Sequence, residues 1–144
     1  MKTFRLVALG GLLLAVSLAA GCDGGPTLAQ LSGAVTFKGQ PVPAGYITFT
    51  PGVGGGSVRV VQIKGGRYDT AAMVGEKGVH PGPNAVRVAG FDGKVVKFWG
   101  QGKQIFNPVD EQFVVPTGAA PTTKDFAVPD AAGTNVKIEP TADE

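Results

Sequence analysis

Glycine and proline interrupt this 144-residue chain so often that no long regular element fits between them. The sequence contains 23 glycines and 11 prolines. Between them lie short runs rich in valine, isoleucine, phenylalanine and tyrosine, which favour strands. Beyond residue 22, no stretch repeats apolar residues at the three- and four-residue spacing of a helix. The pattern predicts an all-β fold of short strands joined by tight turns.

Short strand-like segments recur along the chain, and we expect six to eight strands in one antiparallel β-sandwich. Gly65-Gly66 suits a two-residue hairpin turn, because both positions tolerate positive φ. Asp92-Gly93 is a second turn signal, across which the following segment can pair back. The candidate segments are residues 31–38, 46–50, 58–64, 67–70, 84–89, 94–99, 111–115, 122–128 and 135–139.

Alternation within these segments predicts which side chains are buried. In residues 46–50, Ile47 and Phe49 lie on one face and the polar or amphipathic side chains on the other. Tyr68 follows the expected hairpin turn and fills the space beside Val61 and Ile63. The side chains expected to face inward are Ile47, Phe49, Val61, Ile63, Tyr68, Val86 and Val88.

The N-terminal segment has the three parts of a secretory signal peptide. Residues 1–5 carry two positive charges, residues 6–20 are apolar and uncharged, and small residues precede Cys22. The apolar run is short for a membrane span, which needs about 20 residues. The sequence therefore predicts export and removal of residues 1–21.

Residues 18–22, with the sequence LAAGC, resemble a bacterial lipobox, although the usual leucine position holds Ala19. The resemblance implies cleavage before Cys22 and attachment of fatty acids to it, including a diacylglyceryl group. Two or more acyl chains anchor a protein stably. The alternative is an ordinary secreted protein with a free thiol, which is unusual for an exported chain. Cys22 is the only cysteine.

Charge argues against nucleic acid as a partner. The whole chain has 13 basic and 11 acidic residues, but Lys2 and Arg5 belong to the signal peptide. The rest of the chain is therefore near neutral, and its basic residues are scattered. Nucleic-acid binding normally requires a concentrated positive surface.

Three motifs in order resemble a carboxypeptidase regulatory-like domain. They are LSGAVTFKGQPVPAG at residues 31–45, IKGGRY at 63–68, and GVHPG at 78–82 followed by VRV at 86–88. The family usually has tyrosine two residues after the last glycine, where this chain has Asn84. The match covers residues 31–89. Beyond it, residues 106–108 and 125–126 are similar to those of small planctomycete lipoproteins of this type. The resemblance to the carboxypeptidase regulatory-like domain implies a seven-stranded transthyretin-like β-sandwich. The members of that family are mostly non-catalytic.

The residues supply no arrangement typical of an enzyme, metal or cofactor site. His80 is the only histidine, and a zinc site needs three or four ligands. Neither Ser32 nor Ser57 lies in a nucleophile turn. Asp110 and Glu111 are adjacent, so in a strand they point to opposite faces. We therefore expect no enzyme activity, no cofactor and no metal.

One segment combines aromatic and basic side chains, and two interpretations of it remain open. The aromatic residues could cover an open end of the sandwich as part of the core, since tryptophan is usually largely buried. They could instead form a surface that binds a glycan, a polymer or a protein. The candidate binding surface is Trp99, Phe98, Phe91 and Phe106, with Lys94, Lys97 and Lys103 between them.

Together these features predict four regions: a signal peptide at 1–21, a lipidated tether at 22–30, a β-sandwich at 31–140 and a polar tail at 141–144. The expected function is that of a non-catalytic structural or binding module in the bacterial cell envelope. The membrane would be reached through Cys22, on the outer face of the inner membrane or on the outer membrane, and the partner would be an envelope protein or polymer. The alternative is an accessory domain that assists a separate secreted enzyme such as a peptidase.

Overall fold

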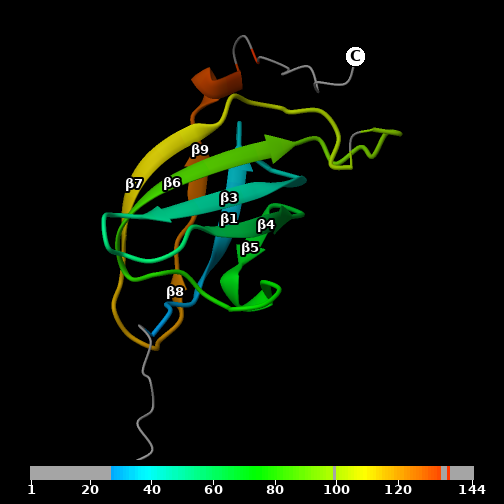
Figure 1. Cartoon of the computed structure of the whole chain (residues 1–144). Coiled ribbons are helices and arrows are strands. Elements are labelled where there is room, and N and C mark those ends of the chain that lie inside the picture. Colours follow the sequence, from blue (N-terminus) through cyan, green and yellow to red (C-terminus); the bar gives the residue numbers. More distant parts are fainter. Residues whose placement is uncertain (1–26, 99, 134–135, 137–144) are drawn as a thin grey trace, which may run out of the picture.

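The computed structural model, which describes residues 27–98, 100–133 and 136, is an all-β fold curled into a β-sandwich (Figure 1). The predicted fold class is therefore confirmed. The strands are β1 (Leu31–Phe37), β2 (Gln40–Pro41), β3 (Ala44–Pro51), β4 (Arg59–Lys64), β5 (Arg67–Asp69), β6 (Gly82–Phe91), β7 (Val109–Val115), β8 (Thr122–Thr123) and β9 (Phe126–Val128). Two single-turn 3₁₀ helices complete the elements, η1 (Thr70–Ala72) and η2 (Asp130–Gly133). No helix in these ranges is long and apolar enough to cross a membrane.

The strands follow one hydrogen-bonded order, β2-β1-β5-β4-β3-β6-β7, and β8 and β9 also pair with β1. All pairs are antiparallel except those of β1 with β8 and β9, which are parallel. The chain turns between the two layers at the β4–β5 hairpin, where only Lys64 and Arg67 are paired. Strand β4 continues beside β3, whereas β5 continues beside β1. The hairpin thus joins the layers and leaves the two strands diverging.

The core lies between these layers and contains all seven side chains predicted to face inward, each at most 3% exposed. The Phe49 ring from β3 meets the Phe126 ring from β9 with their centroids 6.4 Å apart. This contact joins the layer that contains β3 to the layer that contains β9. The expected register of β3, β4 and β6 is therefore correct, because a one-residue shift would have exposed every one of these side chains.

Three predicted segments differ from the structure or fall outside it. Of the predicted segment 94–99, the described residues 94–98 form no strand, because the Asp92 carboxylate holds this stretch as a closed loop. Its Oδ1 accepts hydrogen bonds from the Lys94 and Lys103 N–H groups, both at 3.0 Å. Residues 122–128 form two strands, β8 and β9, rather than one. The expected strand at 135–139 lies outside the described residues except for residue 136.

The break between β8 and β9 arises where the chain crosses β1 at Gly33. A Cβ atom at this position would collide with the Lys124 carbonyl group, so no side chain fits. The crossing is held by two further bonds. The Ala34 N–H donates to Asp125 Oδ1 at 2.7 Å, and the Tyr68 hydroxyl donates to the Lys124 carbonyl at 2.8 Å. Gly33, which the sequence places in the first strand, therefore allows the close approach.

We expect strongly alkaline conditions to destabilise the fold through Tyr68. Burial raises the pKa of the Tyr68 hydroxyl well above its ordinary value near 10, and the charges of Asp125 and Glu111 raise it further. The folded state therefore favours the neutral phenol, and its contribution is complete below about pH 10. It is lost progressively as the pH rises above that value. Melting temperatures at pH 9 and pH 11 should fall less for Tyr68→Phe than for the wild type.

The control for this measurement is Tyr46→Phe, because Tyr46 bonds to the Gln101 side chain and lies outside the core. It leaves the Tyr68 phenol in place, so its alkaline loss should exceed that of Tyr68→Phe. An equal loss in Tyr68→Phe as well would assign the alkaline transition to other groups.

Candidate functional site

Of the four predicted aromatic residues, the three that the structure describes, Phe91, Phe98 and Phe106, do not form one surface. Phe106 is fully buried, with its ring centroid 5.1 Å from that of Phe37 and its edge against Gly90. Phe91 is half-buried and its ring packs edge-on to Tyr46 at 6.4 Å. Phe106 therefore belongs to the core, and its assignment to a binding surface is corrected. The burial of Phe106 could not be predicted from the sequence, because residues 100–108 have no strand periodicity.

Residues 92–104 form a loop that projects from one end of the sandwich, beyond the end of β6 (Figure 1). Four hydrogen bonds close its base. Asp92 N–H donates to the Lys103 carbonyl and Gly93 N–H to the Gln101 carbonyl, both at 2.9 Å, and Asp92 Oδ1 accepts the two bonds from Lys94 and Lys103 described above. The hydrogen bonds that the Asp92 carboxylate accepts, first from the Lys94 N–H and then from the Lys103 N–H, lower the pKa of this carboxyl. We call this segment the 92–104 loop.

Gly102 is required in that closed base. Its φ of +87° favours glycine, and a Cβ atom there would collide with Asp92 Oδ1. Gly102, which has no side chain, therefore leaves room for the Asp92 carboxylate that accepts the hydrogen bonds of the loop base. The consequence is a loop whose base is defined while its tip faces solvent.

The tip of the 92–104 loop exposes consecutive apolar side chains next to lysines. Val95, Val96 and Phe98 are 73%, 50% and 80% exposed. The Lys97 ammonium nitrogen lies 5.6 Å from the centre of the Phe98 ring, within cation–π range. Lys94 and Lys103 are exposed on the same loop. The predicted residues Trp99 and Cys22 lie outside the described residues.

A surface of this kind can bind a partner. Exposed apolar side chains gathered in one place mark interaction sites more often than isolated ones do. The flanking lysines add attraction for an anionic partner. The loop therefore supports the binding interpretation for Phe98, while Phe106 follows the core interpretation.

The remaining candidate residues from the sequence have structural partners. His80 is buried, and its Nε2 accepts a hydrogen bond from the Ser57 N–H at 3.1 Å, which fastens the glycine-rich turn between β3 and β4. Asp110 pairs with Arg87 at 2.7 Å, and this pair lowers the pKa of the Asp110 carboxyl. Glu111 pairs with Lys124 at 2.8 Å. The two adjacent carboxylates thus serve separate ion pairs, as expected for neighbours in a strand.

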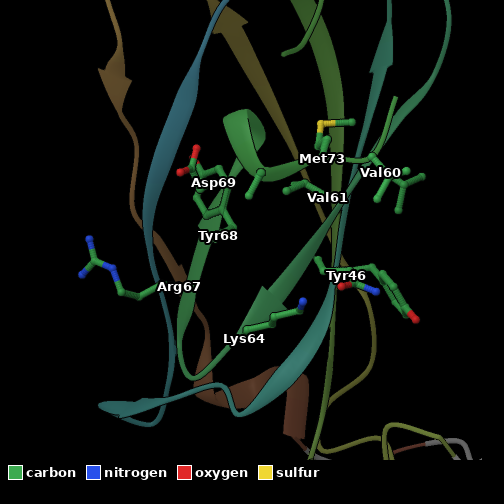
Figure 2. Close-up of a pocket in the computed structure, with 11 residues that line it drawn as sticks. Tyr46, Val60, Val61, Lys64, Arg67, Tyr68, Asp69 and Met73 are labelled. Atoms are coloured by element: carbon green, nitrogen blue, oxygen red, sulfur yellow. The ribbon is translucent and has the colours of Figure 1, made fainter. Parts of the chain in front are cut away.

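A groove that sequence reasoning missed lies where β4 and β5 diverge (Figure 2). We call it the β4–β5 groove. Its volume is about 490 Å³, and it is open to solvent. Its apolar lining comes from both strands, from the last residue of η1 and from the segment after it. These lining residues are Val60, Val61, Tyr68, Ala72, Met73 and Val74.

The ends of the β4–β5 groove differ in charge. Lys64 lies at the hairpin end, and Asp69 lies at the other end beside η1 (Figure 2). Asp69 Oδ1 accepts a hydrogen bond from the Ala71 N–H at 2.8 Å, which caps η1. Arg67 stands near the hairpin on the outer side of β5 (Figure 2). The turn signal at Gly65-Gly66 predicted the hairpin correctly, but not that its strands separate after one pair.

Comparisons with protein family models, with curated proteins and with solved structures find no match to this chain. Within the described ranges, no cluster of three or more histidine, cysteine or carboxylate side chains could hold a metal ion. The 92–104 loop and the β4–β5 groove are the surface features from which we argue a function.

Proposed function

We propose that this protein is a lipid-anchored, non-catalytic binding module of the bacterial cell envelope. The anchor in this proposal is Cys22, and the folded domain carries the binding surface. The 92–104 loop is the observation that supports the binding role, because Val95, Val96 and Phe98 are exposed on a loop with a closed base. A partner that buries these side chains would recover the hydrophobic free energy that they lack in the isolated domain.

We also propose that the domain is related to the carboxypeptidase regulatory-like domains. Two of the motif positions have roles that fit the resemblance. Gly33 is the site of the close crossing by Lys124, and Gly65 and Gly66 have φ values of +56° and +77° in the tight turn. Asn84, where the family has tyrosine, is buried and donates to the His80 and Gly82 carbonyl groups at 3.0 and 2.9 Å. A polar clamp thus stands in place of the expected aromatic side chain.

Replacing Phe98 by serine should weaken capture of an envelope partner without weakening the fold. Phe98 is largely exposed, so the free energy of unfolding should change by about 0.5 kcal/mol or less, as for other surface substitutions. Capture is measured by crosslinking in the native envelope followed by mass spectrometry, comparing variant and wild type. The partner expected is an envelope protein or polymer.

Val53→Ser is the matched control for this experiment, because Val53 is fully exposed but lies in the glycine-rich turn between β3 and β4, outside the β4–β5 groove. It should leave the capture pattern unchanged. Capture that is lost equally in both variants, or retained in Phe98→Ser, would rule out the 92–104 loop as the binding surface. A capture dominated by one secreted enzyme would support the alternative role as an accessory domain.

A further inference from the structure

We propose that the β4–β5 groove binds an extended peptide with an acidic end, which adds to the sheet as a strand along the free edge of β4. This goes beyond the proposed function, because it concerns neither the anchor nor the 92–104 loop. Addition of a strand to an exposed edge is a common mode of peptide recognition, in which main-chain hydrogen bonds supply affinity.

The first support is the free edge of β4. Strand β4 pairs with β3 along its whole length, but with β5 only through Lys64 and Arg67. In an antiparallel pair the backbone groups of alternate residues point to the same side. The N–H and C=O groups of Gln62 and Val60 therefore point, like those of Lys64, towards the groove. Among the described residues, no hydrogen bond reaches them from that side.

The second support is the apolar surface directly beside this edge. Side chains of an added strand alternate, so every second one would point into the groove. There they would meet Val61 and Tyr68 below and Met73 from the segment after η1 (Figure 2). Val60 is about half exposed on β4. Small branched side chains such as valine or threonine fit such a surface better than charged ones do.

The third support is charge, which gives the peptide its polarity. Lys64 is exposed and has no ion-pair partner in the described part of the chain, and Arg67 stands beside the same hairpin. Both cations favour an acidic group at the hairpin end. Asp69 disfavours one at the η1 end. The peptide that fits thus has apolar alternate residues and carries its negative charge near Lys64.

The test uses two synthetic peptides of about six residues, the length of a typical strand. Both alternate valine with threonine, and a pair of aspartates stands at the C-terminus of one and at the N-terminus of the other. Binding to the full chain carrying Cys22→Ala is followed by fluorescence anisotropy. We expect one of the two peptides to bind saturably, and the one that binds gives the direction of pairing.

Two variants separate the backbone and charge contributions. Gln62→Pro removes the N–H group that faces the groove while leaving the β3 side of the strand its donors, a position at which edge strands tolerate proline. It should weaken binding at least about tenfold. Lys64→Glu should weaken the acidic peptide to a similar degree and should bind a version that ends in two lysines instead. Because it changes an exposed side chain, Lys64→Glu keeps the test valid even if Gln62→Pro fails to fold.

Lys97→Glu is the matched control, since it reverses an exposed charge on the 92–104 loop. It should leave peptide affinity unchanged. Three results would overturn the proposal: no saturable binding of any peptide to the folded chain, binding that Lys64→Glu leaves intact, or a dimer in solution that dissociates in Gln62→Pro. The last result would mean that a second copy of the chain occupies the β4 edge.

Discussion

Truncating Phe49 to alanine should lower the free energy of unfolding by about 3–5 kcal/mol, as for other buried phenylalanines. Phe49 is fully buried in β3 and contacts the Phe126 ring of the opposite layer. Its removal leaves a cavity between the layers and takes away an aromatic contact that joins them. The loss is a large fraction of the total stability of a domain of this size. Chemical denaturation of wild type and variant measures it directly.

Thr50→Ala is the control for this prediction, because Thr50 is the next residue of the same strand and is exposed. Its change in unfolding free energy should stay within about 0.5 kcal/mol. If Phe49→Ala were as mild as Thr50→Ala, the assignment of Phe49 to the core would be wrong. A similar loss from both variants would instead point to strand propensity as the cause.

Replacing Cys22 by alanine should abolish fatty-acid labelling and release the protein from the membrane fraction. In our proposal the thiol carries the acyl chains, and each buried methylene contributes about 0.8 kcal/mol to membrane binding. Removing all chains at once therefore changes partitioning from nearly complete retention to release. The measurement is labelling with a radioactive fatty acid in the native host, followed by fractionation.

The matched variant for the anchor is Phe98→Ser, which alters the 92–104 loop and leaves Cys22 intact. It should be labelled and retained like the wild type. A Cys22→Ala protein that still sediments with membranes, together with a wild type that takes up no labelled fatty acid, would contradict the lipoprotein proposal.

The predictable part of the fold is the part whose side chains alternate. In β3 and β4, each position that the period of two placed inward is buried. The reason is that a strand with one buried face has only two registers, and the wrong one exposes the whole apolar set. Residues 94–98 include two valines and a phenylalanine too, yet they form part of a loop. There the decisive feature is the Asp92 carboxylate, whose bonds reach eleven residues along the chain.

The candidate sites were less predictable because they depend on how distant segments meet. Phe98 and Phe106 are both aromatic residues in a glycine-rich stretch, but only Phe106 reaches Phe37 in the core. The β4–β5 groove exists because β5 pairs with β1 rather than continuing to pair with β4. No local pattern in residues 59–69 predicts this pairing of β5 with β1. It depends on contacts with distant segments: Tyr68 lies opposite Gly33 of β1, and its hydroxyl donates to the Lys124 carbonyl.

The direction in which the chain enters the sandwich has a consequence for how the domain would stand on a bilayer. The first described residues enter at the end of the sandwich opposite to the one from which the 92–104 loop projects (Figure 1). With Cys22 acylated, residues 22–29 can extend at most about 28 Å. In our proposal, so short a tether would hold the entry end of the domain near the lipid and would leave the 92–104 loop facing the periplasm or the exterior. Lengthening the tether with glycine and serine should therefore widen the range within which a partner is reached, while the affinity of the loop itself stays constant.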